Sequence, residues 1–372
     1  MRVVINTEYL SEVYSAEYIN FLCKTFERIV KSNPEHTFIF LCKKQHAHIF
    51  TFEKNAQVYI IKQSPSSLLL WKYWYDVKIP VILRKLKADV FISTGGFCSL
   101  TTKIPRCIIL QDLAFLHFPS FFAKRYVSFL KKNTKKFTGK AKRIVTLSDS
   151  SKKDIIKQYD VDENKIDIVY NGSEILQSFS EDLYQEIKEK YTEGKNFFIY
   201  CGSLHRTKNL INLLKAFSVF KKRQQSSMKL LLCATSGADK SLIKSLQTYK
   251  YRNDVVYLDN IEEDELTKLV ASSYALVYPA YFDAFCFPLL EAFRCGVPVI
   301  TSENPTMQEI AGDAALYADP GNYNTIAEQL MLIYKDENKR TELIKAGQLI
   351  TQRYSWNKMA DLLWDSIQKA AL

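Results

Sequence analysis

Short apolar runs alternate with amphipathic helical stretches along the first part of the chain, and the same alternation then begins again. A helical stretch at residues 18–29 has Ile19, Leu22, Phe26 and Ile29 on one face. Runs that favour buried strands lie at residues 3–5, 37–41, 58–61, 90–92, 107–110, 143–147 and 166–169. Strand, helix and strand in this order predict a parallel sheet covered by helices.

The second series follows a turn at residues 171–173 and a polar connector that reaches Gly194. Its strand-like runs lie at residues 196–201, 230–234, 255–258, 275–278 and 297–301. We therefore predict two α/β domains, 1–175 and 176–355, each built on a doubly wound sheet. A final helix at 356–372 is expected to pack back on the first domain. Ligands of such sheets bind beyond the carboxyl ends of the strands, so we expect the site in a cleft between the domains.

Composition excludes several classes of protein. The chain has 372 residues, 47% of them apolar and 24% charged, which are values of folded globular proteins. No apolar run approaches a membrane span and no leader core follows Met1, so we predict a cytoplasmic protein. Eight cysteines without a C-x-x-C pair indicate neither disulfides nor zinc. The net charge of +11 suits nucleic acid, anionic lipid or a phosphorylated small molecule, and it does not choose among them.

The motif at residues 283–299 combines a short helix with two acids. Asp283 lies in the loop after a strand, Pro288 suits the first turn of the helix, and Gly296 suits its end. The helix N-terminus favours an anion, while Asp283 and Glu291 can accept hydrogen bonds from hydroxyl groups on either side of it. An anion between two polyols describes a nucleotide sugar. The alternative is a surface acid and a helix-capping acid without a ligand.

Residues 200–210 form a second motif, in which a strand leads through a glycine turn to two cations before a helix. Gly202 allows the main chain to approach a ligand closely. Arg206 and Lys208 can neutralise a diphosphate with several hydrogen-bond donors. The alternative interpretation is a solvated basic turn.

In order and spacing, these two motifs resemble the retaining GT-B glycosyltransferases of family 4. Other segments that look like the family lie at residues 33–36, 85–90, 112–119, 146–152, 171–172 and 309–314. The resemblance implies a GT-B fold, two Rossmann-like domains facing a central cleft, with the acceptor on the first and the nucleotide sugar on the second. It implies that Lys208, with Arg206 beside it, holds the diphosphate, that Asp283 touches the donor sugar, and that Glu291 binds the donor ribose. The other donor-binding candidates are Gly202, Ser203, Ala284, Phe285, Cys286 and Phe287.

Three positions depart from the family pattern. Asp283 stands where the family usually has Glu, and it is one methylene shorter. The family's His-Asp pair appears as Gln111 and Asp112, which we keep as catalytic candidates, although an amide cannot titrate. The first loop, residues 13–18, contains none of the family's glycines. These departures support an alternative hypothesis, a degenerate glycosyltransferase-like protein that serves as partner or scaffold of an active enzyme.

The family model implies a retaining transfer without a cofactor. The bond between sugar C1 and phosphate loosens, and an acceptor hydroxyl enters on the same face while its proton passes to the departing oxygen. The donor is expected to be a UDP- or GDP-sugar, and no metal is implied. A bare D-x-D pattern at Asp160 and Asp162 lies in a polar stretch, and we interpret it as an exposed turn.

Two stretches in the first half, residues 67–87 and 123–143, combine Lys and Arg with aromatic residues at helical spacing. Such stretches suit a membrane interface. The family resemblance implies a glycan or lipid-linked acceptor that binds to the first half. Together with these stretches, it leads us to predict an anionic membrane surface as a partner and a peripheral position at the inner face of the membrane. The alternative is a solvated charged surface. No DNA- or RNA-binding motif is present, so nucleic acid is not expected as a partner.

Overall fold

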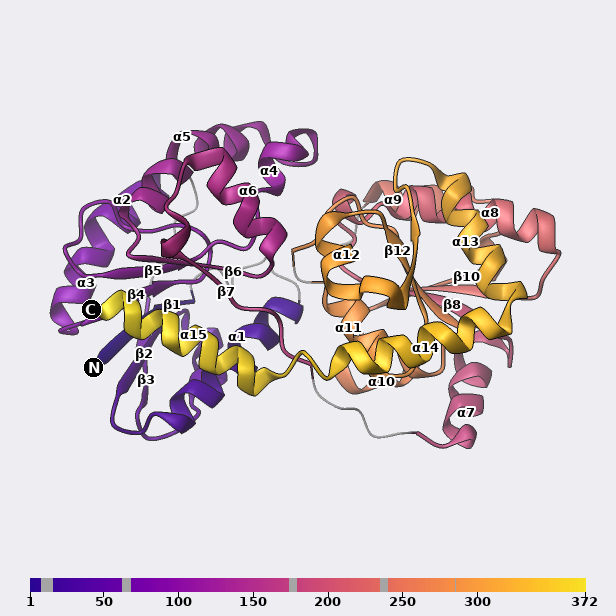
Figure 1. The fold of residues 1–372 in the computed structure, drawn as a ribbon, viewed down its shortest axis with the longest axis horizontal. Helices are drawn as coiled ribbons and strands as arrows, with labels where there is room; N and C mark the ends of the chain where they lie inside the picture. The colour runs from indigo at the N-terminus through magenta and orange to yellow at the C-terminus, as the bar shows by residue number, and fades with distance from the viewer. Residues whose placement is uncertain (8–15, 62–67, 174–178, 235–239, 285) are drawn as a thin grey trace. The chain divides into compact units, whose positions relative to one another are not determined.

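The chain forms two compact units, each with its own parallel sheet (Figure 1). The computed structural model describes residues 1–7, 16–61, 68–173, 179–234, 240–284 and 286–372. Unit 1 contains the first strand, Tyr18–Gly172 and Trp356–Leu372, and unit 2 contains Ser173–Ser355. The predicted α/β fold class, two Rossmann-like units, is confirmed.

Every strand predicted in the first series forms part of the unit 1 sheet. The strands are β1 (Arg2–Asn6), β2 (Thr37–Cys42), β3 (Ala56–Ile60), β4 (Val90–Ser93), β5 (Arg106–Ile109), β6 (Arg143–Thr146) and β7 (Ile166–Ile168). They pair in the order β3-β2-β1-β4-β5-β6-β7, and all the pairs are parallel. The central strands are apolar because helices cover both of their faces.

Helices on one face of this sheet share a single apolar core with it. They are α2 (Leu68–Tyr73), α3 (Ile79–Lys85), α4 (Ala114–His117), α5 (Lys124–Lys140) and α6 (Asp149–Tyr159). A π-helical turn, Trp74–Lys78, joins α2 to α3. Short 3-10 helices lie at Lys44–Phe50, Pro119–Phe121 and Glu163–Lys165.

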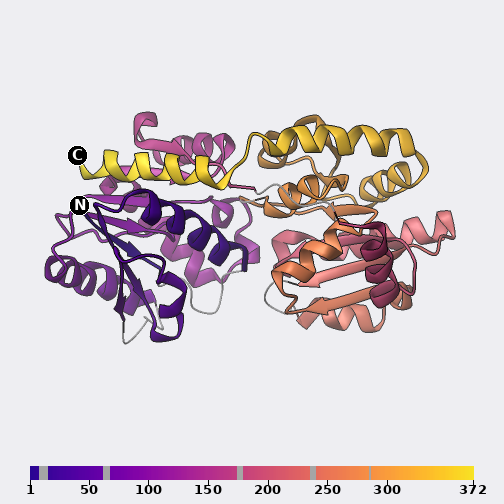
Figure 2. The ribbon, with the colours of Figure 1, turned by 90° about the horizontal axis from the view of Figure 1, so that it is seen from below.

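The opposite face is covered by α1 (Ala16–Ser32) and by α15 (Trp356–Ala371), which returns after all of unit 2 (Figures 1 and 2). Trp364 of α15 packs against Phe38 of β2, with ring centroids 5.6 Å apart. The Thr25 hydroxyl of α1 donates to the sulfur of Met359 at 3.6 Å. The chain therefore completes unit 1 with a segment that follows unit 2.

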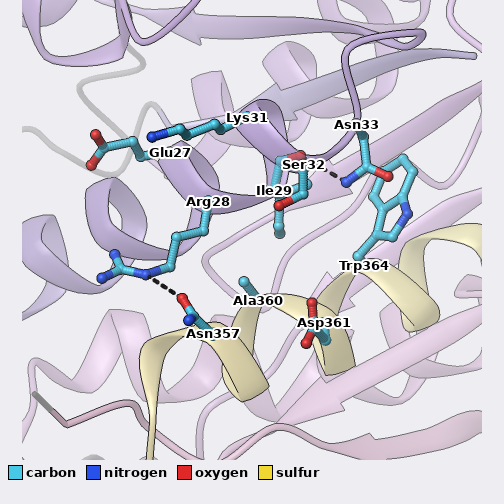
Figure 3. A pocket seen from close by; sticks show the side chains of 10 residues that line it. All are labelled: Glu27, Arg28, Ile29, Lys31, Ser32, Asn33, Asn357, Ala360, Asp361 and Trp364. Atoms are coloured by element: carbon cyan, nitrogen blue, oxygen red, sulfur yellow. Dashed lines mark hydrogen bonds between the residues drawn. The ribbon is translucent and has the colours of Figure 1, made fainter.

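A polar pocket of about 510 Å³ lies between α1 and α15 (Figure 3). The Arg28 guanidinium donates to the side-chain oxygen of Asn357 at 3.0 Å across it. Other residues on its wall are Glu27, Lys31, Asp361 and Trp364. α1 contributes Glu27, Arg28 and Lys31 and α15 contributes Asp361, so acids and bases are mixed and the pocket has no single charge that selects a ligand.

Gly172 lies directly against Trp356, the first residue of α15. A Cβ atom added there would lie 2.6 Å from the Cα of Trp356 and 2.5 Å from its ring. We expect Gly172→Ala to lower the free energy of unfolding by about 1–3 kcal/mol, as overpacking does. Gly139→Ala in α5 is the matched control, because a Cβ there meets nothing within 4 Å. It is expected to leave stability unchanged or raise it by up to about 1 kcal/mol. Equal denaturation midpoints for both variants would contradict this account.

Unit 2 repeats the doubly wound plan. Its strands are β8 (Phe197–Gly202), β9 (Lys229–Ala234), β10 (Val255–Asp259), β11 (Ala275–Tyr278), β12 (Val299–Ser302) and β13 (Ala315–Ala318), in the order β10-β9-β8-β11-β12-β13. Its helices are α7 (Glu181–Thr192), α8 (Leu210–Gln224), α9 (Lys240–Gln247), α10 (Glu263–Ala271), α11 (Phe287–Arg294), α12 (Pro305–Ala311), α13 (Tyr323–Lys335) and α14 (Glu337–Thr351). Short 3-10 helices lie at Arg206–Lys208, Arg252–Asp254 and Gly312–Ala314. The sequence did not predict β13.

Candidate functional site at the switch point of unit 2

The two predicted motifs meet at the place where the strand order of unit 2 reverses. β8 and β11 are neighbours in the sheet although β9, β10 and the helices α8, α9 and α10 lie between them in the chain. The basic turn follows β8, and the loop with Asp283 follows β11. In doubly wound sheets, ligands bind at this switch point beyond the carboxyl ends of the strands.

The basic turn has the backbone that the sequence predicted. Gly202 has φ of 140°, a region that favours glycine. His205 precedes the 3-10 turn, and its Nδ1 accepts from the Thr207 amide at 3.3 Å. Asn209 then adopts the left-handed conformation, with φ of 62°, before α8 begins. These local contacts fix the direction in which Lys208 leaves the turn.

Two asparagines join the loops at the carboxyl ends of the strands. The Asn209 amide donates to the carbonyl oxygens of Pro279 and Pro320, at 2.9 Å and 2.7 Å. Asn212 donates to the same Pro320 oxygen at 2.9 Å and to the Tyr281 hydroxyl at 3.1 Å. The loops after β8, β11 and β13 are thus held together by buried or half-buried hydrogen bonds.

Lys208 and Asp283 form a buried ion pair at the centre of this arrangement. Lys208 Nζ lies 2.6 Å from Asp283 Oδ2, and the two side chains are 12% and 5% exposed. The Tyr278 hydroxyl donates to the same Oδ2, and the Cys286 amide donates to Oδ1 at 3.3 Å. The ammonium group also lies 5.4 Å from the centroid of the Tyr278 ring. The carboxylate therefore serves as the counter-ion of Lys208, and its orientation is fixed from two further sides.

Glu291 lies on α11, whose predicted start and end are confirmed by Pro288 in the first turn and by Gly296 with φ of 68°. Its Oε1 accepts from the Thr267 hydroxyl at 3.0 Å and from Arg294 at 2.7 Å. The side chain is 26% exposed. Glu291 is thus held in place while part of its carboxylate remains accessible.

The other donor-site candidates of unit 2 occupy different environments. Arg206 is exposed, whereas Ala284 and Cys286 are buried and Phe287 is half-buried. The Ser203 carbonyl accepts from the Tyr200 hydroxyl. Phe285 lies outside the described residues. Burial raises the pKa of the Cys286 thiol well above its usual value, so this cysteine stays protonated and is no nucleophile at neutral pH.

The candidates of unit 1 follow β5. The Gln111 carbonyl accepts from the Thr146 hydroxyl at 3.3 Å, and Asp112 Oδ1 accepts from the Ala114 amide at 2.7 Å, where α4 begins. Both residues are half-buried. Their role toward a donor sugar stays a prediction. Of the glycine-free first loop, residues 13–15 lie outside the part of the chain that the structure describes.

The D-x-D pattern is accounted for by turns. Asp160 ends α6 with φ of 53°, and Asp162 Oδ1 accepts from the Asn164 amide at 2.9 Å. Within the described ranges, the structure contains no cluster of three or more His, Cys, Asp and Glu side chains that could hold a metal ion.

Tyr278, Asn209 and Asn212 are the residues of this site that the sequence did not reveal. Tyr278 ends an apolar strand and was predicted only as one of its core residues. The asparagines follow a basic turn and have no motif of their own. Asn209 could have been found as an Asn directly before a predicted helix, because Asn tolerates the left-handed conformation that it adopts there better than most residues do.

By its fold, the chain is a protein of two doubly wound units. A candidate anion site lies at the switch point of the second unit. Residues 35–175 match the model of Glycosyltransferase Family 4, and residues 184–349 match that of Glycosyl transferases group 1. The chain therefore belongs to the glycosyltransferases of the GT-B fold, and it is an enzyme of that class.

Individual relatives agree with this assignment. The O-antigen chain mannosyltransferase RfbU of Salmonella typhimurium is 29% identical over 292 residues, which are 75% of this chain and 77% of that protein. The O-antigen chain mannosyltransferase B of Escherichia coli is 26% identical over 272 residues, 72% of this chain and 71% of that one. The structure of Anabaena HepE in complex with UDP and glucose superposes with a TM-score of 0.77 at 16% identity and covers 99% of both chains.

Proposed function

We propose that this glycosyltransferase transfers a sugar from a nucleotide-diphosphate donor to a glycan or lipid-linked acceptor, with retention of the anomeric configuration. The observation that carries the proposal is the buried pair of Lys208 and Asp283 at the switch point of unit 2. A cation that is held at the mouth of a doubly wound sheet suits a diphosphate. The mannosyltransferase relatives make mannose the first sugar to test.

The chemistry depends on where negative charge develops. As the C1–oxygen bond breaks, the departing diphosphate gains charge, and a fixed cation near it lowers the barrier because it binds the transition state more strongly than the ground state. Lys208 is that cation, exposed Arg206 adds a second positive charge, and the N-terminus of α11 adds its dipole. An acceptor hydroxyl attacks C1 on the same face and gives its proton to the leaving oxygen.

The same charges support a reaction without a metal ion. Lys208, Arg206 and the dipole of α11 offer a diphosphate partial charge compensation from the protein itself, so we expect that no divalent cation is required as counter-ion. The expected result is full activity after dialysis against EDTA. A loss of activity in EDTA that Mg²⁺ or Mn²⁺ restores would contradict this part of the proposal.

A thermal-shift screen against UDP, GDP and their sugars tests donor binding. We expect one diphosphate to raise the melting temperature by several degrees, because a ligand that binds only the folded state stabilises it. The anomeric configuration of the product, determined by NMR, then tests retention. A nucleotide that binds while neither transfer nor donor hydrolysis occurs would favour the alternative, a degenerate protein that supports an active enzyme.

Tyr278 is expected to act as a positioning residue for Asp283 and Lys208. Tyr278→Phe keeps the ring, which stacks on Tyr200 with centroids 5.6 Å apart, and removes the hydroxyl that donates to Asp283. We expect kcat to fall about tenfold, since a hydrogen bond to a charged group is lost, while KM changes less.

The matched control for this change is Tyr274→Phe. It removes a hydroxyl that donates to the Ile333 carbonyl at 3.3 Å in the same unit, outside the site. Its kcat is expected to equal that of the wild type. If both variants lose activity in proportion to their melting temperatures, Tyr278 contributes to folding alone.

A further inference from the structure

A row of exposed apolar side chains runs along the outside of unit 1. Leu70, Tyr73, Val77 and Val81 are 49%, 51%, 45% and 53% exposed. They are spaced by three, four and four residues along α2, the π-helical turn and α3, so they lie on one side of this helical segment. The inner side buries Trp74, Tyr75, Ile79 and Leu83. The segment is thus apolar on both sides, which is unusual for a surface helix of a globular unit.

The middle of this segment, Trp74–Lys78, is a π-helical turn that contains residues of both the inner and the outer side. The Ile79 amide donates to the Trp74 carbonyl, five residues back. Tyr75 within this turn is buried, and the side-chain amide of Asn6 donates to its hydroxyl at 2.7 Å. Tyr73 and Val77 on either side of it stay outside. Single π-helical turns occur often at functional sites.

Exposed cations lie on the same helical segment as this row, and the single acid of the segment is bonded to the interior of the unit. Lys72, Lys78, Arg84, Lys85 and Lys87 are all exposed. Asp76 is the one acid between residues 68 and 87, and its Oδ1 accepts from the Leu100 amide at 2.8 Å inside the unit. The outer side of the segment is therefore apolar and positively charged.

The neighbouring helix α5 carries further cations and no acid. Its exposed basic residues are Lys124, Arg125, Lys131, Lys132, Lys135, Lys136 and Lys140. α5 lies in the same helical layer as α2, because Trp71 and Phe129 both contact Phe97, with ring centroids 4.1 Å and 6.1 Å from it. We call the exposed residues of α2, the π-helical turn, α3 and α5 the outer surface of unit 1.

We propose that the outer surface of unit 1 binds an anionic lipid bilayer. Apolar side chains in a row, with a tyrosine among them and lysines beside them, match the depth profile of a membrane interface, where acyl chains lie beneath negatively charged headgroups. The acid-free α5 adds the attraction of several lysines to an anionic surface. A nucleic acid would bind the cations and leave the four apolar side chains exposed to water, so it matches this surface less well than a bilayer does.

The biological role of this surface rests on the proposed function, because the surface would bring the enzyme to a lipid-linked acceptor. The binding itself is a property of unit 1 and does not require donor turnover. No helix in the described ranges has the length and apolar character needed to cross a bilayer, so attachment through this surface would be peripheral.

Flotation with vesicles tests the proposal on the full chain. The wild type is expected to bind vesicles of three parts phosphatidylcholine and one part phosphatidylglycerol, and to bind pure phosphatidylcholine vesicles at least about tenfold less well, since each lysine at an anionic surface contributes. Lys131→Glu with Lys135→Glu should weaken binding by about tenfold or more. Val77→Ser with Val81→Ser should weaken the binding that remains at high salt.

Lys44→Glu with Lys54→Glu is the matched control, because these exposed lysines of unit 1 lie on neither α2, α3 nor α5. It changes the net charge equally and should leave vesicle binding as in the wild type. Equal binding to neutral and anionic vesicles, equal losses in control and test variants, or tighter binding to a random RNA oligonucleotide than to vesicles would overturn the proposal.

Donor hydrolysis without lipid separates this inference from the proposed function. All these variants are expected to hydrolyse the donor as the wild type does, and unchanged melting temperatures show that they fold. If hydrolysis persists and no variant or lipid changes binding, the membrane surface alone is wrong. If vesicles bind and no donor is hydrolysed, the proposed function is wrong and the surface stands.

Discussion

Lys208→Ala is expected to lower kcat/KM for transfer about 10²–10³-fold, the loss that follows removal of one donor from a site of developing negative charge. The Lys208 ammonium is 2.6 Å from Asp283, and its side chain is 12% exposed, so its charge is poorly screened by water. Initial rates with the donor found in the nucleotide screen measure the effect. The nucleoside diphosphate should also lose most of the stabilisation that it gives to the wild type.

Folding and function must be separated in this experiment, because Lys208→Ala leaves the buried Asp283 carboxylate without its cation. Lys208→Met combined with Asp283→Asn removes both charges and keeps the volume of the pair. The double variant should recover stability and remain inactive. Lys222→Ala, at an exposed position of α8, is the control for the loss of one positive charge. Activity of the double variant close to that of the wild type would exclude Lys208 as the cation of the site.

Glu291→Ala is expected to abolish discrimination between the ribose and deoxyribose forms of the nucleotide. In the wild type, a carboxylate that accepts from a ribose hydroxyl should favour the ribonucleoside diphosphate about 10–100-fold over its 2′- or 3′-deoxy form. Titration calorimetry of both nucleotides with both proteins gives a double-mutant cycle. The wild type should prefer the ribonucleotide over one of the two deoxy forms, and Glu291→Ala should bind both with equal affinity. The cycle then gives the coupling energy between Glu291 and that hydroxyl.

Two further variants make this cycle specific. Glu291→Gln keeps the volume and an acceptor for Thr267, so it should fold normally and retain part of the discrimination. Glu328→Ala removes an exposed acid from α13 and should bind both nucleotides as the wild type does. If Glu291→Ala weakens both nucleotides by the same factor, Glu291 supports the loop and makes no contact with the ribose.

The fold was predictable because buried parallel strands are short apolar runs between turns. The exception is β13, whose sequence Ala-Leu-Tyr-Ala offers two apolar side chains of useful size and two alanines of low strand propensity. Its pairing with β12 comes from the sheet edge that β12 presents. α11 was predictable for the opposite reason, because Pro288 and Gly296 mark its ends within the sequence itself.

The candidate site was predictable in its residues and not in its contacts. The sequence indicated Lys208 and Asp283 as two separate motifs, each directed at a ligand. The structure pairs them with each other, because the strand order makes β8 and β11 neighbours. The role of Tyr278 depends on the hydrogen bond that its hydroxyl donates to Asp283, and residue periodicity carries no information about such a contact.

The return of α15 to unit 1 has a consequence for the order of folding during synthesis. A nascent chain emerges from the ribosome with all seven strands of the first sheet long before the helix that covers Phe38 has been translated. All of the second Rossmann-like fold is made in between. Until α15 has been made, the part of this face that α15 covers, Phe38 included, stays open to water, although α1 is already present on the same face.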